Sequence, residues 1–285
     1  MSAATKCWGI YRETAHSPGR VDDDAAILNR VGEVLAARGF NVELLTADAA
    51  DAAFETPGAN IFAMCERSDV LDRLDTAARA GAIVVNSPDA IRNTYRHRMI
   101  ERFVQHQVSA PASHVVATDA SKLPPGFGCV WIKRFDFHAT QPDDVMYSAS
   151  EEGWRKASRR FAERGFTFVV VQQNVPGDLV KFYGVSRRTV GPPGPDWFKW
   201  FYHRDRGMMG HAFDAARLRD AALGAAAALG LEIFGGDAII QADGEPVIID
   251  LNAWPSYALY RDEAAQAIAN HLADRFQRRL RAVTR

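Results

Sequence analysis

Hydrophobic and polar positions follow two alternating periods over the first part of the chain. Four short apolar runs predict β-strands at residues 7–11, 41–45, 60–64 and 82–86. Between these runs, residues 22–38 and 68–80 carry apolar side chains at helical spacing, and Gly39 and Gly81 stand where such helices should end. Strands that alternate with helices form parallel sheets, so this region is predicted to be an α/β unit.

The pattern changes after Pro88, which stands at a favourable position to begin a helix over residues 89–107. Later apolar runs, separated by Gly and Pro, indicate an antiparallel sheet with strands at residues 130–133, 166–173 and 179–186. The last part of the chain predicts an Ala-rich helix, a pair of strands and a closing helix at residues 214–229, 233–241, 246–251 and 262–280.

Composition and charge exclude several classes of protein. The chain has 285 residues and a formal net charge of −1, which argues against a dedicated nucleic-acid-binding protein. The aromatic and basic stretch at residues 197–204 is therefore interpreted as a packed strand or a flap over a cleft, and not as a nucleic-acid surface. There is no segment typical of a signal peptide or a membrane span, so we expect a soluble cytoplasmic protein without a membrane partner.

Familiar hydrolase motifs are also missing. The three cysteines lie far apart and give no disulfide framework or zinc motif. No two histidines have the H-x-x-x-H spacing of a zinc hydrolase, and the sequence contains no Gly-x-Ser-x-Gly elbow. The chemistry must therefore come from other residues.

Polar side chains interrupt two apolar strands near the C-terminus. Asp250 and Asn252 lie two positions apart, so on a strand both side chains point to one face. Asp237 lies on the preceding strand, and a hairpin would bring it to the same place. Carboxylate and amide oxygens suit a hard cation such as Mg²⁺, especially one shared with phosphate oxygens. The alternative is that these residues merely terminate a strand.

Two weaker features lie between the predicted helix at residues 89–107 and this pair of strands. Lys133 ends an apolar strand, where it could place a charge on phosphate oxygens or simply reach the surface. The strand over residues 166–173 becomes polar before Pro176 and Gly177. This segment could be a hinge that reads an adenine edge, or an ordinary loop.

The order of these features resembles the ATP-grasp superfamily, and the resemblance covers most of the chain. The sequence pattern most resembles those of ribosomal-protein glutamate ligases and glutathione synthetase, with some features of inositol phosphate kinases. It lies in residues 86–91, 170–181 and 250–256. The implied fold is α/β (α+β), with a Rossmann-like pre-grasp domain at residues 1–88 and an ATP-grasp domain at residues 89–285. The latter would comprise a lid subdomain at about 112–176 and an antiparallel metal-binding subdomain at about 177–285.

The resemblance implies a role for each matching residue. Lys133 would hold the α- and β-phosphates, and Asp178 would accept hydrogen bonds from the ribose. The adenine hinge would be formed by Gln172, Gln173, Asn174 and Val175. The Mg²⁺ ligands would be Asp237, Asp250 and Asn252. Cations facing the transferred phosphate or the substrate would be Lys181 and Arg187 or Arg188.

Three departures from the family pattern stand out. Arg96, or alternatively Arg98, occupies the place of the usual lysine in the connecting helix. The hinge has glutamine or asparagine in place of glutamate, and Asp250 stands where ligases favour glutamate. The lid loop at residues 135–141 lacks the usual glycines and carries His138, a candidate contact to phosphate or substrate.

The implied activity is an ATP- and Mg²⁺-dependent ligase that joins a carboxylate to an amine, or to a peptide terminus, through an acylphosphate. A kinase with a hydroxyl acceptor is the alternative, and a non-catalytic nucleotide-binding module is a third possibility. Related enzymes are often oligomers, so a homo-oligomer is possible here. The candidate substrate contacts are Arg20, Arg67, His138, Ser256 and Tyr257.

Overall fold

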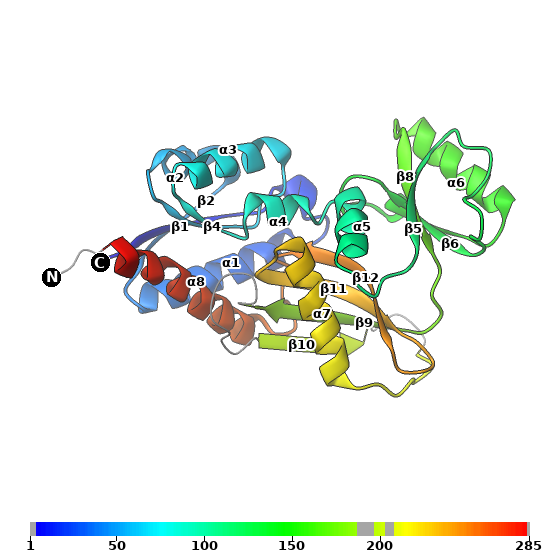
Figure 1. The fold of residues 1–285 in the computed structure, drawn as a ribbon. Helices are drawn as coiled ribbons and strands as arrows, with labels where there is room; N and C mark the ends of the chain where they lie inside the picture. The colour runs from blue at the N-terminus through cyan, green and yellow to red at the C-terminus, as the bar shows by residue number, and fades with distance from the viewer. Residues whose placement is uncertain (1–3, 187–196, 203–207, 284–285) are drawn as a thin grey trace.

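The computed structural model describes residues 4–186, 197–202 and 208–283, which form three four-stranded sheets (Figure 1). The first sheet has the order β2-β1-β3-β4, and all of its strands are parallel. Its strands are β1 (Lys6–Ile10), β2 (Asn41–Leu45), β3 (Asn60–Ala63) and β4 (Ile83–Val85). The parallel α/β unit predicted from the sequence is therefore present.

Helices cover both faces of this first sheet. The helices α2 (Asp51–Glu55) and α3 (Ser68–Arg79) lie on one face, and α1 (Val21–Ala37) lies on the other (Figure 1). Side chains alternate along each strand, so Ile61 packs with the α2 and α3 side while the neighbouring Phe62 packs with the α1 side. The closing helix α8 (Arg261–Val283) packs against α1, so the end of the chain returns to the first unit.

The second sheet is antiparallel, with the order β5-β8-β6-β7. Its strands are β5 (Ser113–Ala117), β6 (Val130–Arg134), β7 (Val145–Ser148) and β8 (Phe168–Gln173). The helix α6 (Glu151–Glu163) covers one face through Trp154 and Phe161, which pack on Val169 and Val171. The sequence pattern did not predict β5, β7 or α6. The two strands are short and lie at the sheet edges, and α6 carries few apolar residues.

The third sheet is also antiparallel, with the order β10-β9-β11-β12. Its strands are β9 (Asp178–Val185), β10 (Trp197–Tyr202), β11 (Ile233–Ile240) and β12 (Pro246–Ala253). The Ala-rich helix α7 (Ala215–Leu229) packs closely on this sheet. The predicted antiparallel pair β11–β12 is confirmed, and the stretch at 197–202 is a packed edge strand.

The single helix predicted at residues 89–107 is wrong, because the chain forms α4 (Pro88–Arg92) and α5 (Arg96–Gln105) with a break between them. Distant groups hold this break: Asn93 donates to the carbonyl of Leu229 at 3.0 Å, and the amide of Arg96 donates to the carbonyl of Asp136 at 3.0 Å. Such contacts leave no trace in local periodicity.

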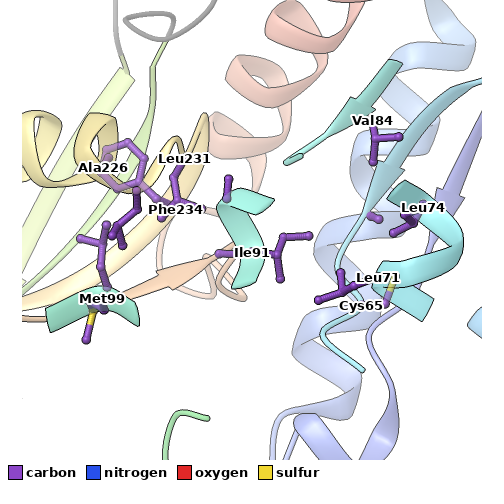
Figure 2. Packing of buried hydrophobic residues seen from close by; sticks show 14 of the residues in the cluster. Cys65, Leu71, Leu74, Val84, Ile91, Met99, Ala226, Leu231 and Phe234 are labelled. Carbon is purple, nitrogen blue, oxygen red and sulfur yellow. The ribbon is translucent and has the colours of Figure 1, made fainter. Parts of the chain in front are cut away.

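The helix α4 lies between the first unit and the third sheet. Figure 2 shows Ile91 between the side chains of Leu71 and Leu74 on one side and those of Leu231 and Phe234 on the other. Short 3-10 turns complete the described structure at Thr14–His16, Ala47–Ala49 and Pro142–Asp144. Among the described residues, no helix combines the length and the apolar character needed to cross a membrane.

Candidate active site

A cavity of about 690 Å³ lies between the second and third sheets. Three apolar side chains, Leu179, Ile239 and Ile249, form part of its wall. The other lining residues include most of those predicted from the sequence: Arg96, Lys133, Gln172, Gln173, Asn174, Val175, Asp237 and Asp250. A larger cavity of about 850 Å³ lies against α8, but of the predicted site residues that the structure describes, none lines it.

Two cations enter the first cavity from different elements. Lys133, on β6, is 7% exposed, and its Nζ donates to the carbonyl of Ile249 at 3.4 Å. Burial lowers the pKa of Lys133 to about 8, partly offset by the charge of Asp250. Because this ammonium has lost most of its contact with water, an anion that enters the cavity would stabilise its charge strongly.

Arg96 begins α5 and is 2% exposed. Its Nη1 donates to the carbonyls of Arg134 and Phe137 at 3.2 and 2.8 Å, and its Nη2 lies 3.9 Å from Oδ2 of Asp250. Its buried Nε has no hydrogen-bond partner in the described part of the chain. Of the two arginines considered from the sequence, Arg96 lines the cavity, whereas Arg98 is not among the lining residues.

The segment between β8 and β9 forms one wall. Asn174 accepts a hydrogen bond from Nε1 of Trp131 at 2.9 Å, and Nε2 of Gln172 donates to Oγ of Ser113 at 3.3 Å. Gly177 has a φ of 152°, and a Cβ there would lie 2.2 Å from the carbonyl oxygen of Ile240. The wall is therefore held close to the third sheet by a residue that must be glycine.

The structure places Asp178 differently from the predicted ribose acceptor. Its carboxylate is 1% exposed and accepts from the amides of Met209 and His211, the latter at 2.7 Å. These hydrogen bonds lower the pKa of Asp178 although burial opposes the shift. Asp178 does not line the cavity, because the segment before α7 folds over it and donates hydrogen bonds to both of its carboxylate oxygens.

The three predicted metal ligands come together. Asp237 on β11 is the register partner of Asp250 on β12, and Asn252 lies two positions farther on the same strand. All three line a second cavity of about 340 Å³. The donors are all oxygens, which fits Mg²⁺. No group of three or more His, Cys, Asp or Glu within residues 4–186, 197–202 and 208–283 could hold a metal, so the fit depends on the amide oxygen of Asn252 as well as the two carboxylates.

The second cavity also contains candidate substrate contacts. Lys181 lines it, and its Nζ lies 2.8 Å from Oδ1 of Asp237. Arg20, His138 and Ser256 line the same space. The two cavities share Asp237 and Asp250, so the carboxylates stand at the boundary between them.

The structure does not bring Arg67 or Tyr257, both predicted to contact substrate, into either cavity. Arg67 is paired with Asp48 and Asp69 at the surface, both at 2.7 Å, and lines neither cavity. Tyr257 is fully buried, and its hydroxyl lies 3.1 and 3.0 Å from the carbonyls of Gly184 and Phe234. Arg187 and Arg188 fall outside the described residues.

Sequence reasoning missed the role of Arg12. Its Nη1 pairs with the carboxylate of Glu66, and its Nη2 donates to the carbonyls of Ala253 and Trp254 at 3.1 and 2.6 Å. Nδ1 of His138 lies 3.0 Å from Oε2 of Glu66. Arg12 and Glu66 follow β1 and β3 closely, and residues at the carboxyl ends of parallel strands are those that usually reach a ligand site. That position is the signal that could have pointed to Arg12.

Sequence comparison gives no match. A scan against models of protein families finds none that fits this chain, and a search of curated proteins also finds no match. Solved structures do match. The RimK domain protein ATP-grasp from Sphaerobacter thermophilus superposes with a TM-score of 0.65 over 94% of this chain and 100% of that one, at 16% identity.

Two further solved structures agree with this match. The D-Ala:D-Ser ligase VanG from Enterococcus faecalis gives a TM-score of 0.67 over 96% of this chain and 99% of that one, at 13% identity. The D-alanine–D-alanine ligase from Bacillus anthracis complexed with ATP gives 0.68 over 96% and 98%, at 12% identity. The chain has the ATP-grasp fold. Within this fold, the first cavity lies between the two antiparallel sheets, and it is lined by Lys133 from the second sheet and Asp250 from the third.

Proposed function

We propose that this ATP-grasp chain is an ATP- and Mg²⁺-dependent ligase that joins a carboxylate to an amine through an acylphosphate. One observation carries the proposal. A cavity with two buried cations shares the carboxylates of Asp237 and Asp250 with a second cavity. A nucleotide in the first cavity would present its terminal phosphate to an acceptor in the second. The solved neighbours include an L-amino acid ligase as well as the ligases named above, which supports a carboxylate acceptor.

Binding of ATP is assigned to the first cavity. Lys133 and Arg96 neutralise the α- and β-phosphates, and the apolar side chains of Ile239 and Ile249 contact the base or sugar. The backbone of residues 173–175 contacts the adenine edge. Carbonyl groups hold Arg96 and Lys133 in place, so these cations would lower the barrier by positioning and charge neutralisation rather than by covalent chemistry.

Asp237, Asp250 and Asn252 would hold Mg²⁺ at the boundary of the two cavities. When bound, Mg²⁺ neutralises the charge that develops on the transferred phosphoryl group. The chain supplies the orientation, because the pairing of β11 with β12 fixes the two carboxylates opposite each other. Lys181 faces the same group from β9 and stabilises the phosphoryl oxygens after they leave ATP.

The second cavity would hold the substrate carboxylate and the amine. Arg20 and Ser256 offer a cation and a hydroxyl that can bind a carboxylate. Amino acids carry both reacting groups in a small volume, and 340 Å³ accommodates molecules of that size. We therefore assign small amino acids, or the end of a peptide, as the first substrates to test.

A kinase with a hydroxyl acceptor is the second candidate. The observation that favours it is Asp250, the shorter carboxylate at a position where ligases favour glutamate. The same ATP cavity and the same Mg²⁺ ligands would serve both reactions. The two differ in the product, because a phosphoryl group on a hydroxyl is stable whereas an acylphosphate reacts with amines.

One assay separates these activities. The protein is incubated with ATP, Mg²⁺ and hydroxylamine, in one series with pools of L- and D-amino acids and in another with a pool of polyols, and both ADP and hydroxamate are measured. A ligase forms hydroxamate in proportion to ADP, whereas a kinase forms ADP only with a polyol pool and gives no hydroxamate. Absence of ADP release and of ADP binding would refute both.

The control variant is Lys133→Met, which keeps the length of the side chain and removes its charge. It should abolish ADP and hydroxamate formation together. A matched surface variant, Lys122→Met, lies in an exposed segment and should keep both activities. Hydroxamate that persists in Lys133→Met would show that a contaminating enzyme produces it.

A further inference from the structure

A histidine–carboxylate pair lies at the edge of the second cavity. His138 belongs to the lid loop at residues 135–141, and Glu66 follows β3 of the first sheet. Nδ1 of His138 lies 3.0 Å from Oε2 of Glu66. His138 also lines the cavity that contains Asp237, Asp250 and Asn252. The pair therefore connects the lid to the first unit at the place where the acceptor should bind.

The charges and burial around this pair determine which of its atoms carry protons. The Glu66 side chain is 3% exposed, and burial alone would raise its pKa. The charge of Arg12, followed by that of His138, outweighs burial and holds the pKa of Glu66 well below its usual range. Glu66 is therefore ionised, and an ionised carboxylate can only accept hydrogen bonds. Nδ1 of His138 must be the donor.

A proton fixed on Nδ1 determines the state of the other ring nitrogen. In the neutral ring, Nε2 carries the lone pair and is the basic atom. The His138 side chain is 22% exposed and lines the second cavity, so part of the ring is accessible to a ligand there. A buried carboxylate that orients a histidine in this way is the arrangement by which proteins hold an imidazole ready to accept a proton.

The reaction proposed above requires such a group. An amino acid enters as an ammonium ion, which has no lone pair and cannot attack an acylphosphate. No lysine or tyrosine among the residues that line the second cavity is free for this task, since Lys181 is paired with Asp237. Asp237 and Asp250 are assigned to Mg²⁺. Asp24 on the same wall accepts a hydrogen bond from Ser17 and lies 3.4 Å from Nε of Arg12. Nδ1 of His16 lies 3.8 Å from Oε2 of Glu66, too far for a hydrogen bond that would orient its ring. His138, at 3.0 Å from the same oxygen, is the base on this wall whose ring is held in one orientation.

We propose that His138 is the general base that deprotonates the attacking amine, and that Glu66 is the positioning residue that holds its tautomer and orientation. This inference rests on the proposed ligase function. One ammonium proton passes to Nε2 of His138. The nitrogen lone pair attacks the carbonyl carbon, the C–N bond forms, and the C–O bond to phosphate breaks with its electron pair leaving on phosphate. The second nitrogen proton leaves with the phosphate.

The charges around His138 set the pH at which it acts. The charge of Glu66 raises the pKa of His138, although burial opposes the shift. Other charged or titratable groups that face the same space come from several elements: Arg12, His16, Arg20, Asp24, Lys181, Asp237 and Asp250. The rate of amide formation should therefore increase with pH through the raised pKa of His138. Glu66→Gln removes the main cause of that shift and should move this limb to lower pH.

Two nucleophiles distinguish a base from a binding group. Amino acid amines are protonated at pH 7 and need a base, whereas hydroxylamine is largely neutral and does not. In His138→Gln, amide formation should fall about 10²- to 10⁴-fold, the usual contribution of a general base, while hydroxamate formation stays within a few-fold of the wild type. The matched control is His114→Gln, because His114 is exposed on β5 and should leave both rates unchanged.

The outcomes separate this inference from the proposed function. If the wild type forms no hydroxamate with any amino acid, the ligase function itself fails. If the wild type forms hydroxamate but His138→Gln loses hydroxamate and amide equally, His138 serves phosphoryl transfer or binding, and the base assignment is overturned. If neither rate changes, the assignment is overturned as well. ADP binding by His138→Gln, measured by calorimetry, shows whether the variant remains folded and can bind nucleotide.

Discussion

Nζ of Lys181 lies 2.8 Å from Oδ1 of Asp237, and Asp237 is also the register partner of Asp250. Two carboxylates on neighbouring positions repel each other, and the ammonium of Lys181 offsets part of that repulsion. The strands β9, β11 and β12 thus carry a cation and two anions side by side across the sheet. This arrangement suits a site in which charges on the protein are exchanged for those of Mg²⁺ and phosphate.

The first prediction concerns this carboxylate pair. In the double variant Asp250→Ala with Asn252→Ala, Mg²⁺ should no longer strengthen ADP binding, because two of the three oxygen donors are gone. Calorimetric titration of ADP with Mg²⁺ and with EDTA measures the difference, which we expect to be at least about 10-fold in the wild type, the effect of one well-placed charge contact. Asp243→Ala removes an exposed carboxylate in the β11–β12 turn and should keep it. Metal dependence that survives in the double variant would refute the ligand assignment.

Site residues that lie close together in the sequence could be predicted from the sequence most directly. Asp250 and Asn252 share a face because a strand repeats every two residues, and that rule needs no knowledge of the fold. The turn residues Asp243 and Gly244 between two apolar strands predicted the hairpin that brings Asp237 to them. Lys133 lies on β6 and lines the cavity, but the local pattern of an apolar strand ended by one cation also fits a surface lysine, so the resemblance was needed to suggest its role.

Residues whose surroundings come from distant segments could not be placed. Tyr257 follows a strand in a loop-like segment, yet its side chain is buried in the core. Its hydroxyl donates there to carbonyls of β9 and β11. Asp178 was assigned to ribose by its position in the hinge, but amides of residues 209 and 211 take its oxygens. The pairing of Glu66 with His138 joins segments that are far apart in the chain. Only tertiary structure determines such contacts.

The second prediction follows from the pKa of Lys133. Phosphate binding favours the charged ammonium, and in the free protein this ammonium loses its proton near pH 8. ADP affinity should therefore decrease above about pH 8, by up to about 10-fold per pH unit, because binding then requires uptake of a proton. In Lys133→Met the affinity should be about 10- to 100-fold lower at pH 7, as expected for a lost charged hydrogen bond, and this pH dependence should disappear. Calorimetry from pH 7 to pH 9.5 tests both; an affinity independent of pH in the wild type would contradict the assignment.

The third prediction concerns the hinge. Gly177→Ala places a Cβ 2.2 Å from the carbonyl oxygen of Ile240 at a φ that side chains avoid, so the wall of the first cavity must move. We expect ADP affinity to fall and the protein to lose about 1–3 kcal/mol of stability, the usual range for forcing a side chain into such a conformation. Gly128→Ala is the control, since nothing lies within 4 Å of its added Cβ. Equal effects of the two substitutions would show that the close approach at Gly177 is not real.

The fourth prediction concerns Asn86, which joins the first sheet to the third. Its Nδ2 donates to the carbonyl of Ile233 at 2.8 Å, and its Oδ1 accepts from the amides of Glu232 and Ile233 at 2.8 and 3.0 Å. Asn86→Ala leaves these buried groups without partners and should cost about 2–4 kcal/mol, measured by urea unfolding. Asn60→Ala removes a single bond to the carbonyl of Lys6 and should cost less than about 1.5 kcal/mol. A smaller loss for Asn86→Ala than for Asn60→Ala would contradict the structural role.

The last prediction concerns the loop at residues 135–141, whose fold depends on Asp144. This carboxylate has no exposed surface, pairs with Arg164 and lies 3.3 Å from Nη1 of Arg134. It also accepts from the amides of Thr140 and Gln141 at 2.8 and 3.1 Å. The loop that carries His138 is therefore ordered by a buried anion and not by glycines. Burial would raise the pKa of Asp144, but hydrogen bonds from Arg164 and Thr140 lower it below its usual value.

Because the folded-state pKa of Asp144 is lowered, the stability that it contributes is present above its unfolded pKa, near pH 4, and is lost as pH falls below that value. Asp144→Ala should therefore destabilise the protein by about 3–5 kcal/mol at pH 7, the usual cost of breaking a buried ion pair. The difference from the wild type should shrink as pH falls below about 4. The neighbouring Asp143, which pairs with Arg160 at the surface, supplies the control, because Asp143→Ala should cost less than about 1 kcal/mol at either pH. Urea unfolding at pH 7 and pH 3.5 measures these differences; a loss for Asp144→Ala that does not depend on pH would mean that packing, and not the charge of Asp144, holds the loop.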